Sequence, residues 1–424
     1  MNRTLKEFDL LDVHTSFFNI RNVKRIDPVM LLLVLALAAA GLAVLYSASR
    51  STSVAPVFSV HVEKWPFYQK QGLFLIAGIF LALVMMCLDT RFLVSLAPVM
   101  YAATMLLLLA VILFGTEAKG GQRWLPVGPF RLQPSEQTKI VVIYMLAWYL
   151  SMIKERIQKF PYLILTFAIV GVPAVLILKQ PSLGVAMTLM PLAFVMAYAA
   201  GCKGWHLALI LVAGILITPK AYEHLEPYQQ TRLISFVYPS DYKPSGDPEK
   251  DAAEAPWQIK MLDKVGIKVP KADPEDIAQG SGWQTRQSKI TVGSGGFYGK
   301  GFTKGTQTML NYLPEHHTDF IFSLLAEEKG FIGAIAVLTL FAAFLLRGLQ
   351  FAKDCQDMAG TLLGVGAVTI LAFHVFVNIA ITIGIMPVTG IPLPFLSYGG
   401  NFYLTTMMAV GMLLNIPVRK QLFD

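Results

Sequence analysis

The sequence predicts an all-α, polytopic membrane protein with ten transmembrane helices, and its composition and segment lengths support that fold class. Of the 424 residues, 55% are hydrophobic and 15% are charged, whereas soluble domains carry about 25% charged residues. A helix that crosses the hydrocarbon core of a bilayer needs about 20 mostly apolar residues. A soluble enzyme and a disordered scaffold are therefore excluded. Suitable stretches occur over residues 27–48, 69–88, 92–113, 135–151, 160–178, 181–200, 203–217, 319–346, 358–384 and 400–415.

The orientation follows from the basic residues, which resist translocation and gather in cytoplasmic loops. With the N-terminus inside, more Lys and Arg residues fall in the inner segments than in the short outer ones. Both termini are therefore expected in the cytoplasm. These loops also account for the formal net charge of +8, and no nucleic-acid partner is expected. Cys87, Cys202 and Cys355 form no C-x-x-C pair, so neither a disulfide framework nor a cysteine zinc site is indicated.

One connection is far longer than the others and is expected on the outer side. It is longer than loops without a role of their own usually are. Within it, residues 241–276 are crowded with Asp, Glu and Lys. They are interpreted as an insertion that is solvated, with contact to a partner protein as the alternative. The predicted organisation is a cytoplasmic leader (1–26), transmembrane helices 1–7 (27–217), a large extracytoplasmic loop (218–318), transmembrane helices 8–10 (319–415) and a cytoplasmic tail (416–424).

Charged residues gather at the outer ends of the apolar stretches. Each is a candidate for function, because a charge in a membrane is costly unless it is paired or hydrated. Glu136 and Lys139 are three positions apart and can pair on one helix face. Arg123 and Trp124 lie in the loop before them, and Asp319 begins the eighth stretch. Cations bind phosphate oxygens, and a carboxylate can take a proton from a hydroxyl group. Together, these cations and the carboxylate are suited to bind a phosphorylated head group whose tail stays in the lipid.

Several of these charged and aromatic residues also have a purely structural interpretation. Trp124 is equally well explained as an interfacial anchor, and Glu136 with Lys139 as an intramembrane pair. Glu327 and Glu328 lie two turns into the eighth stretch and are expected either to pair internally or to reach the inner polar region.

The histidines and one glycine-rich segment are weaker candidates for a functional site than the charged residues. His316 and His317 are adjacent, and adjacent residues converge poorly on a metal without further ligands. His206 and His374 lie within apolar stretches and are interpreted as packing residues. GSGGFYGKG at residues 293–301 fails the phosphate-loop spacing and is expected to form a turn.

Four long segments resemble, in this order, the signature segments of the SEDS family (shape, elongation, division and sporulation). They are GGQRWLPVGPFRLQPSEQTK, QSKITVGSGGFYGKGFTKGTQ, LPEHHTDFIFSLLAEEKGFIG and GIMPVTGIPLPFLSYGGN. The resemblance runs from about residue 30 to 416, with LYSAS at 45–49 and EPYQQTR at 226–232 as further matches. The segments GTQTMLNYLPEHHTDFIF and LLAEE are more similar in sequence to the elongation branch of the family, RodA, than to the division branch, FtsW.

The resemblance implies a ten-span peptidoglycan glycosyltransferase of the bacterial inner membrane. Its substrate would be lipid II, the undecaprenyl-pyrophosphate-linked disaccharide pentapeptide, polymerised on the outer face. Its partners would be a class B penicillin-binding protein, the transpeptidase, and the rest of the elongation machinery. The family's essential aspartate falls on Asp319. Its substrate-binding positions fall on Arg123, Trp124, Gln133, Ser135, Glu136, Lys139, Gln229 and Arg232.

One departure from the family pattern lies at the start of the sixth stretch. This chain has QPSLGV where the family usually has QPDLGT, so Ser182 stands in place of an acidic residue. A carboxylate that could pair with a cation is therefore missing there, and no role is expected at that position.

The hypothesis from the sequence is a sugar transfer in which Asp319 removes the proton of the acceptor hydroxyl. Arg123, Lys139 and Arg232 would offset charge on the leaving pyrophosphate. The motifs require no cofactor and identify no metal ligands, although a divalent cation could share that task. One alternative is a lipid II flippase or transporter, which needs polar groups along a path through the midplane. Another is a non-catalytic scaffold, in which Asp319 only caps its helix.

Overall fold

The computed structural model describes most of the apolar part of the chain. The charged insertion at 241–276 lies outside the described residues except for Lys260, and so do the leader up to residue 25 and the last four residues. The described residues are 26–51, 65–118, 121–128, 130–225, 229–230, 232–233, 236, 260, 281–310, 312–313 and 315–420.

Every one of the ten predicted stretches is helical. Backbone groups in hydrocarbon have no water to bond, so an apolar stretch satisfies them within its own helix. The ten helices are α1 (Pro28–Ser51), α2 (Phe67–Cys87), α3 (Thr90–Phe114), α4 (Pro134–Ile153), α5 (Phe160–Leu178), α6 (Leu183–Ala199), α7 (Gly204–Glu223), α14 (Ile321–Asp354), α15 (Met358–Thr382) and α16 (Gly400–Lys420).

Eight of the described helices are long and apolar enough to cross a membrane, namely α1, α2, α3, α5, α7, α14, α15 and α16. The other two differ in kind: α6 is apolar but has 17 residues, and α4 carries Glu136 and Lys139. The prediction of a helical, polytopic membrane protein is confirmed, and the number of ten spans stays a prediction.

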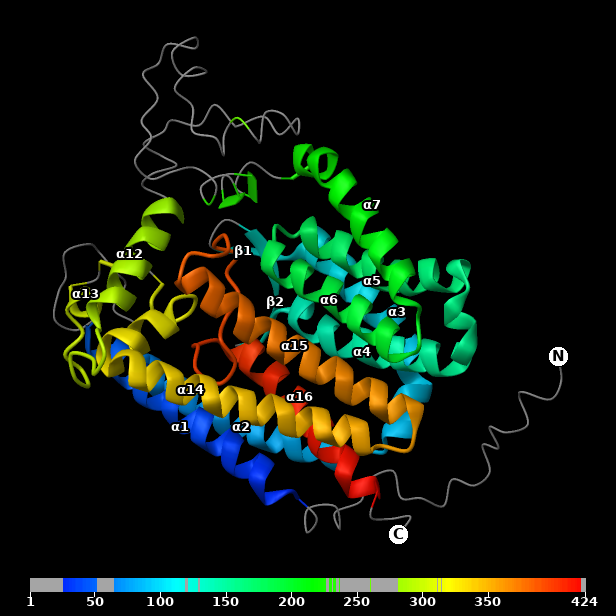
Figure 1. Ribbon diagram of the computed structural model, residues 1–424, viewed down its shortest axis with the longest axis horizontal. Coiled ribbons are helices and arrows are strands. Elements are labelled where there is room, and N and C mark those ends of the chain that lie inside the picture. The colour runs from blue at the N-terminus through cyan, green and yellow to red at the C-terminus, as the bar shows by residue number, and fades with distance from the viewer. Residues whose placement is uncertain are drawn as a thin grey trace.

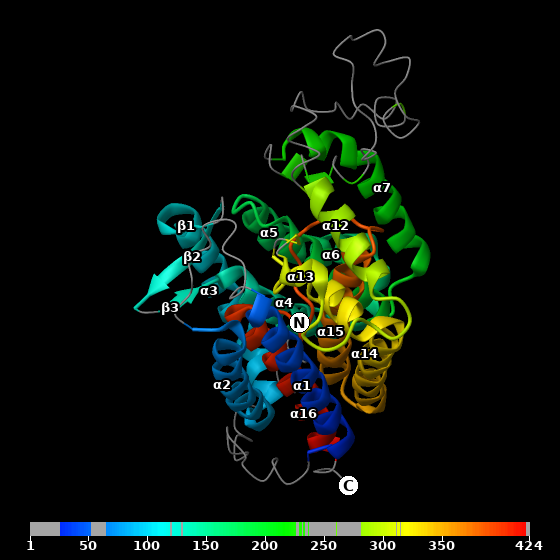
Figure 2. The ribbon, with the colours of Figure 1, turned by 90° about the vertical axis from the view of Figure 1, so that its left-hand side faces the viewer.

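The helices form one bundle whose long members run side by side. α14 packs against α15 and α1, and α16 packs against α2 (Figure 1). The start of α1 and the end of α16 lie at the same end of the bundle in both views (Figures 1 and 2). α7 leans away from the bundle, and only His206 and Tyr222 of its residues are buried.

Side-chain caps and one ion pair fix several helix ends. Asp89 accepts hydrogen bonds from the first backbone amides of α3, and Asp357 does the same for α15. Asp27, just before α1, forms an ion pair with Arg347 of α14 at 2.5 Å. Burial alone would raise the pKa of Asp27, but hydrogen bonds from Arg347 and from the amide of Met30 outweigh burial and lower it. The pair therefore ties α1 to α14 at the end of the bundle where α1 begins.

The connection between α3 and α4 forms a small antiparallel sheet, which the sequence analysis did not predict. Its strands are β1 (Thr116–Ala118), β2 (Gly121–Val127) and β3 (Phe130–Leu132), in the order β1-β2-β3. Leu125 pairs with Leu132 and Val127 with Phe130. The sheet projects to one side of the bundle (Figure 2). It carries Arg123 and Trp124 on β2.

Two short helices belong to the long loop between α7 and α14. They are α12 (Ser281–Ser294) and α13 (Thr306–Met309). Both lie at the opposite end of the bundle from the end of α16 (Figure 1). A 3₁₀ turn, Lys154–Gln158, joins α4 to α5.

Helix α14 is broken at Gly330, and the predicted turn at 293–301 packs against the break. Gly330 has φ 66° and ψ −164°, a conformation that essentially only glycine adopts. The amides of Lys300 and Gly301 donate to the carbonyls of Glu327 and Glu328, both at 3.0 Å. In return, the amide of Phe331 donates to the carbonyl of Gly296, also at 3.0 Å. Backbone groups that the break releases are thereby hydrogen-bonded, as such groups must be wherever water cannot reach them.

Candidate functional site

Asp319 lies in the last turn before α14 and is held through its backbone. Its amide donates to the carbonyl of Glu315 at 3.2 Å. Asn378 of α15 donates through Nδ2 to the carbonyl of Asp319 at 2.9 Å and to that of Ile391 at 2.8 Å. Because Asn378 is completely buried, this bridge is shielded from competing water. The carboxylate itself is partly exposed, as a group that meets a substrate must be.

The irregular segment between α15 and α16 docks on the same turn. Ser397 donates its hydroxyl to the carbonyl of Thr318 at 2.6 Å, and the amide of Tyr398 donates to that of His317 at 2.9 Å. The ring of His317 stacks on Phe67 of α2, with centroids 4.1 Å apart. Three elements distant in sequence therefore fix the turn that carries Asp319.

The side chains of Asp319 and Arg232 both approach Gly390. A Cβ atom placed on Gly390 would lie 3.5 Å from Arg232 Nη1 and 3.6 Å from Asp319 Oδ2. Gly390 has φ 71°, which favours glycine. The preceding loop residue, Thr389, touches the start of α6, since a Cβ on Gly184 would lie 2.6 Å from its carbonyl oxygen. A carboxylate and a guanidinium thus flank one loop at the site.

A second charged group lies buried between α4 and α15. Lys139 Nζ is 2.7 Å from Glu136 Oε2, and the two side chains are 1% and 6% exposed. The same nitrogen lies 3.1 Å from His374 Nε2 and 5.3 Å from the ring centre of Phe402. The predicted Glu136–Lys139 pair is confirmed, and the structure adds a histidine to it.

Helix α15 connects the two parts of the site. His374 contacts Lys139, and Asn378 contacts Asp319. These residues are four positions apart, so they lie on one helix face, about 6 Å apart along the axis. The lysine and the aspartate are therefore held by neighbouring turns of one helix.

Arg123 and Trp124 lie on β2, at one edge of this arrangement. Arg123 donates to the carbonyl of Gln180 at 3.3 Å and to that of Pro181, which lie in the connection between α5 and α6. Gln180 in turn donates to the carbonyl of Leu108 at 3.0 Å. Trp124 is half-buried. Arg123 therefore holds the α5–α6 connection, an action the sequence hypothesis did not include.

The remaining predicted residues line the start of α4 and the long loop. Gln133 is the half-buried residue that precedes α4, and Gln229 is buried. Ser135 is buried, and within the described part of the chain its hydroxyl has no hydrogen-bond partner. The same holds for the side-chain oxygens of Asn378 and Thr389. Buried polar atoms are usually hydrogen-bonded, so these three oxygens are exceptions among the buried polar groups around the site.

Two residues that organise the site were not chosen as site residues from the sequence. Asn378 and His374 are polar residues inside an otherwise apolar helix, which is itself a signal of function in a membrane. The sequence by itself suggests only a packing role for His374, and it does not single out the amide of Asn378. Only the fold brings them to Lys139 and Asp319.

Other polar candidates have structural partners. Glu327 is fully buried and accepts hydrogen bonds from Lys300 at 2.7 Å and from the amide of Gln307 at 2.9 Å. Glu328 accepts from Ser47 of α1. The predicted internal pairing is therefore confirmed for Glu327, and its partner is Lys300. Among the residues that the structure describes, no three His, Cys, Asp or Glu side chains converge as a metal site would need.

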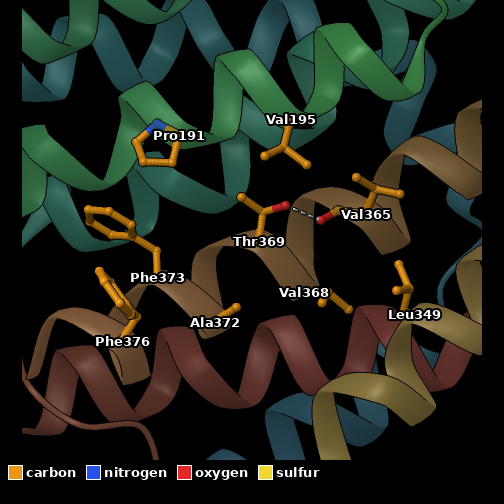
Figure 3. A pocket seen from close by; sticks show the side chains of 9 residues that line it. All are labelled: Pro191, Val195, Leu349, Val365, Val368, Thr369, Ala372, Phe373 and Phe376. Carbon is orange, nitrogen blue, oxygen red and sulfur yellow. Dashed lines mark hydrogen bonds between the residues drawn. The ribbon is translucent and has the colours of Figure 1, made fainter. Parts of the chain in front are cut away.

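An apolar groove of about 380 Å³ lies between α6, α14 and α15. Its one hydroxyl, on Thr369, is donated to the carbonyl of Val365 at 2.7 Å (Figure 3). The groove therefore offers hydrocarbon contacts and no free polar group. It is lined by Pro191, Val195, Leu349, Val365, Val368, Thr369, Ala372, Phe373 and Phe376.

Known proteins resemble the chain over nearly its whole length. A family model described as "Cell cycle protein" (FTSW_RODA_SPOVE) matches residues 28–260 and 268–422. A probable peptidoglycan glycosyltransferase FtsW from Trichlorobacter lovleyi is 35% identical over 405 residues, covering 93% of this chain and 94% of that protein. The peptidoglycan glycosyltransferase MrdB of Escherichia coli K12 is 33% identical, covering 94% and 95%.

Solved structures share the fold. A chain in a peptidoglycan synthase complex that coordinates polymerization and crosslinking has a TM-score of 0.70 at 28% identity and covers 94% of this chain and 99% of its own. The rod shape-determining protein RodA of Thermus thermophilus has a TM-score of 0.60 at 25% identity, covering 94% and 98%. With the family model matched across the bundle and most of the loop between α7 and α14, the chain belongs to the SEDS family, the family of FtsW, RodA and SpoVE.

Proposed function

We propose that this protein is a peptidoglycan glycosyltransferase that polymerises lipid II into glycan strands, with Asp319 as the general base. The observation that carries the proposal is that the Asp319 carboxylate and the Arg232 guanidinium both lie close to Gly390. A carboxylate next to a guanidinium, on a partly exposed turn, is the arrangement that a proton transfer beside a phosphorylated leaving group needs. Relatives that match nearly the whole chain are peptidoglycan glycosyltransferases.

In this reaction a hydroxyl of the acceptor sugar attacks the anomeric carbon of the donor. The new glycosidic C–O bond forms as the bond between that carbon and the pyrophosphate oxygen breaks. The lipid pyrophosphate leaves with the electron pair, and Asp319 takes the hydroxyl proton. Deprotonation makes the hydroxyl a stronger nucleophile at the moment of attack.

The cations would offset the charge that develops on the pyrophosphate. Arg232 is the cation beside Asp319, and its planar guanidinium can bind two phosphate oxygens at once. Lys139 already shares its charge with Glu136, so it would act as a fixed, partly neutralised donor. Arg123 would contribute mainly by holding the α5–α6 connection. We propose that Trp124, Gln133, Ser135 and Gln229 contact the sugar or the phosphates.

The site would lie on the outer side of the bacterial inner membrane. The start of α1 and the end of α16 share one end of the bundle, and α12 and α13 lie at the other. The basic residues near the termini favour a cytoplasmic position for the first end. The membrane would then hold both lipid-linked substrates near one plane, which lowers the entropic cost of bringing them together.

A class B penicillin-binding protein fits as the partner. A solved relative belongs to a complex that coordinates polymerization and crosslinking. We further propose that the protein acts in cell elongation, because the amino-acid sequence just before Asp319 is closer to that branch of the family. Curated relatives include both FtsW and MrdB at similar identity, so this choice needs its own test. Expression in cells depleted of their elongation enzyme should restore rod shape, and rescue of division alone would contradict it.

The direct test of the activity uses purified protein and fluorescent lipid II in detergent, with products separated by length. Glycan strands are the expected result. A flippase would instead move lipid II across vesicles without lengthening it, and a scaffold would do neither. The transporter alternative is less well supported because its two deepest polar candidates have partners within the protein: Glu327 bonds to Lys300 and Gln307, and Glu328 bonds to Ser47.

A further inference from the structure

His374 lies at the centre of the contacts around Lys139. Its Nδ1 atom is 2.8 Å from the carbonyl oxygen of Ile370, and its Nε2 atom is 3.1 Å from Lys139 Nζ. A carbonyl oxygen only accepts hydrogen bonds, so Nδ1 carries a hydrogen. In the neutral ring Nε2 then has the free lone pair. Helix geometry therefore selects the tautomer that accepts a hydrogen bond from the lysine.

The charged form of the histidine does not suit this contact. An imidazolium has a hydrogen on both ring nitrogens, so Nε2 would point an N–H group at an ammonium. Like charges at this distance in a dry environment repel strongly. The 3.1 Å contact is therefore explained by a neutral acceptor.

Lys139 needs an acceptor from a second helix to hold one position. Its bond to Glu136 joins residues three apart on the same helix, and a lysine stem has four rotatable carbons. His374 contributes a contact from α15, and Phe402 of α16 lies under both groups, 5.3 Å from Nζ and 5.1 Å from the imidazole centre. Three helices therefore confine one ammonium group.

The Lys139 ammonium group also has one N–H donor that neither Glu136 nor His374 uses. It has three N–H groups, and within the described residues its polar contacts are Glu136 and His374. One N–H therefore remains for a ligand. The face of α15 that presents His374 also presents Asn378, which holds Asp319, so the remaining donor is fixed relative to the carboxylate.

We propose that His374 is a positioning residue for the sugar transfer, acting as a neutral hydrogen-bond acceptor that fixes the Lys139 ammonium relative to Asp319. This inference rests on the proposed function. It assigns to His374 no contact with substrate. Its effect must therefore pass through Lys139.

Two substitutions separate this role from simple packing. His374→Gln supplies an acceptor oxygen near the place of Nε2 but removes the ring, whereas His374→Phe keeps a ring over Phe402 but removes the acceptor. We expect the Gln variant to keep kcat within about threefold and the Phe variant to lose about tenfold or more, the effect of a lost hydrogen bond to a charged group. KM should change little in either. If the ring matters for packing, the order is reversed and the proposal is wrong.

A double-mutant cycle tests whether His374 acts through Lys139. In a Lys139→Met background, His374→Phe should cause no further loss of kcat, because the group it positions is gone. Additive losses would contradict the proposal. His206→Phe, a change at another buried histidine outside the site, is the matched control and should leave kcat unchanged.

The experiment also separates this proposal from the proposed function. All variants are compared as purified protein of verified thermal stability in lipid II polymerisation. If Asp319→Asn polymerises as well as the wild type, the catalytic assignment fails. If Asp319→Asn is inactive while His374→Phe matches the wild type, only the role of His374 fails.

Discussion

The side-chain amide of Asn378 lies 2.9 Å from the backbone oxygen of Asp319, across 59 positions of the chain. The same amide lies 2.8 Å from the carbonyl of Ile391. One buried side chain thus joins the turn before α14 to the loop after α15. The position of the proposed base is therefore set by α15 as much as by its own helix.

Replacement of Asn378 by leucine should reduce the activity of each folded molecule, in addition to any loss of stability. The variant keeps the size of the side chain but leaves two carbonyls without their donor, which costs about 1–3 kcal/mol for each buried unsatisfied group. The turn would shift, and kcat for lipid II polymerisation should fall about tenfold or more. Asn415→Leu is the control, because Asn415 likewise donates to the carbonyls of Met85, Met86 and Leu88. It should lower the melting temperature and spare kcat per folded molecule.

The ion pair of Lys300 and Glu327 should be important for stability rather than for chemistry. Glu327 is fully buried, and the Lys300 side chain is 25% exposed. Lys300→Met would leave a buried carboxylate without its cation and should cost about 2 kcal/mol. Lys304→Met, in the same loop, changes an exposed residue and should cost almost nothing. Thermal unfolding in detergent compares the two, and equal melting temperatures would contradict this role.

The break in α14 should tolerate no side chain at Gly330. A Cβ there would lie 2.6 Å from the carbonyl oxygen of Phe297, and the backbone conformation is strained for any other residue. Gly330→Ala should cost about 2 kcal/mol or more. Gly171→Ala is the control, since nothing lies within 4 Å of its Cβ position. It should be neutral or slightly stabilising, and a similar loss in both variants would refute the argument.

His316, three residues before the proposed base, should make the stability of the protein depend on pH. Burial lowers the pKa of His316, despite its hydrogen bond to the carbonyl of Leu313. As pH falls below about 6.5, the unfolded chain takes up a proton that the folded protein does not. Stability should therefore decrease on acidification. Melting temperatures at about pH 7.5 and pH 5.5 should differ less for His316→Gln than for the wild type. An unchanged difference would exclude this group as the cause.

The fold was largely predictable because its signal is local. Membrane helices follow from continuous apolar runs, and all ten predicted stretches are helical. The pairing of Glu136 with Lys139 was predictable for the same reason, since both lie on one helix. The small sheet was not predicted, because Gly121–Val127 and its partner strands are short and pair only locally with one another.

The contacts between distant segments could not be predicted from spacing. Nothing in the sequence indicates that Asn378 bonds Asp319 or that Lys300 reaches Glu327 across 27 positions. Arg123 was expected to face phosphate, but its guanidinium also bonds backbone oxygens at Gln180 and Pro181. Such contacts depend on which helix faces pack together, and a single sequence carries little information about that.

The central claim is that the carboxylate of Asp319 takes the proton in glycan polymerisation. The most direct measurement is the rate of lipid II polymerisation by purified Asp319→Asn and by Glu315→Gln, which changes a carboxyl group in the same turn. Asp319→Asn should lose about a hundredfold or more, the usual share of a general base, while Glu315→Gln stays near the wild-type rate. A near-normal rate for Asp319→Asn would contradict the account.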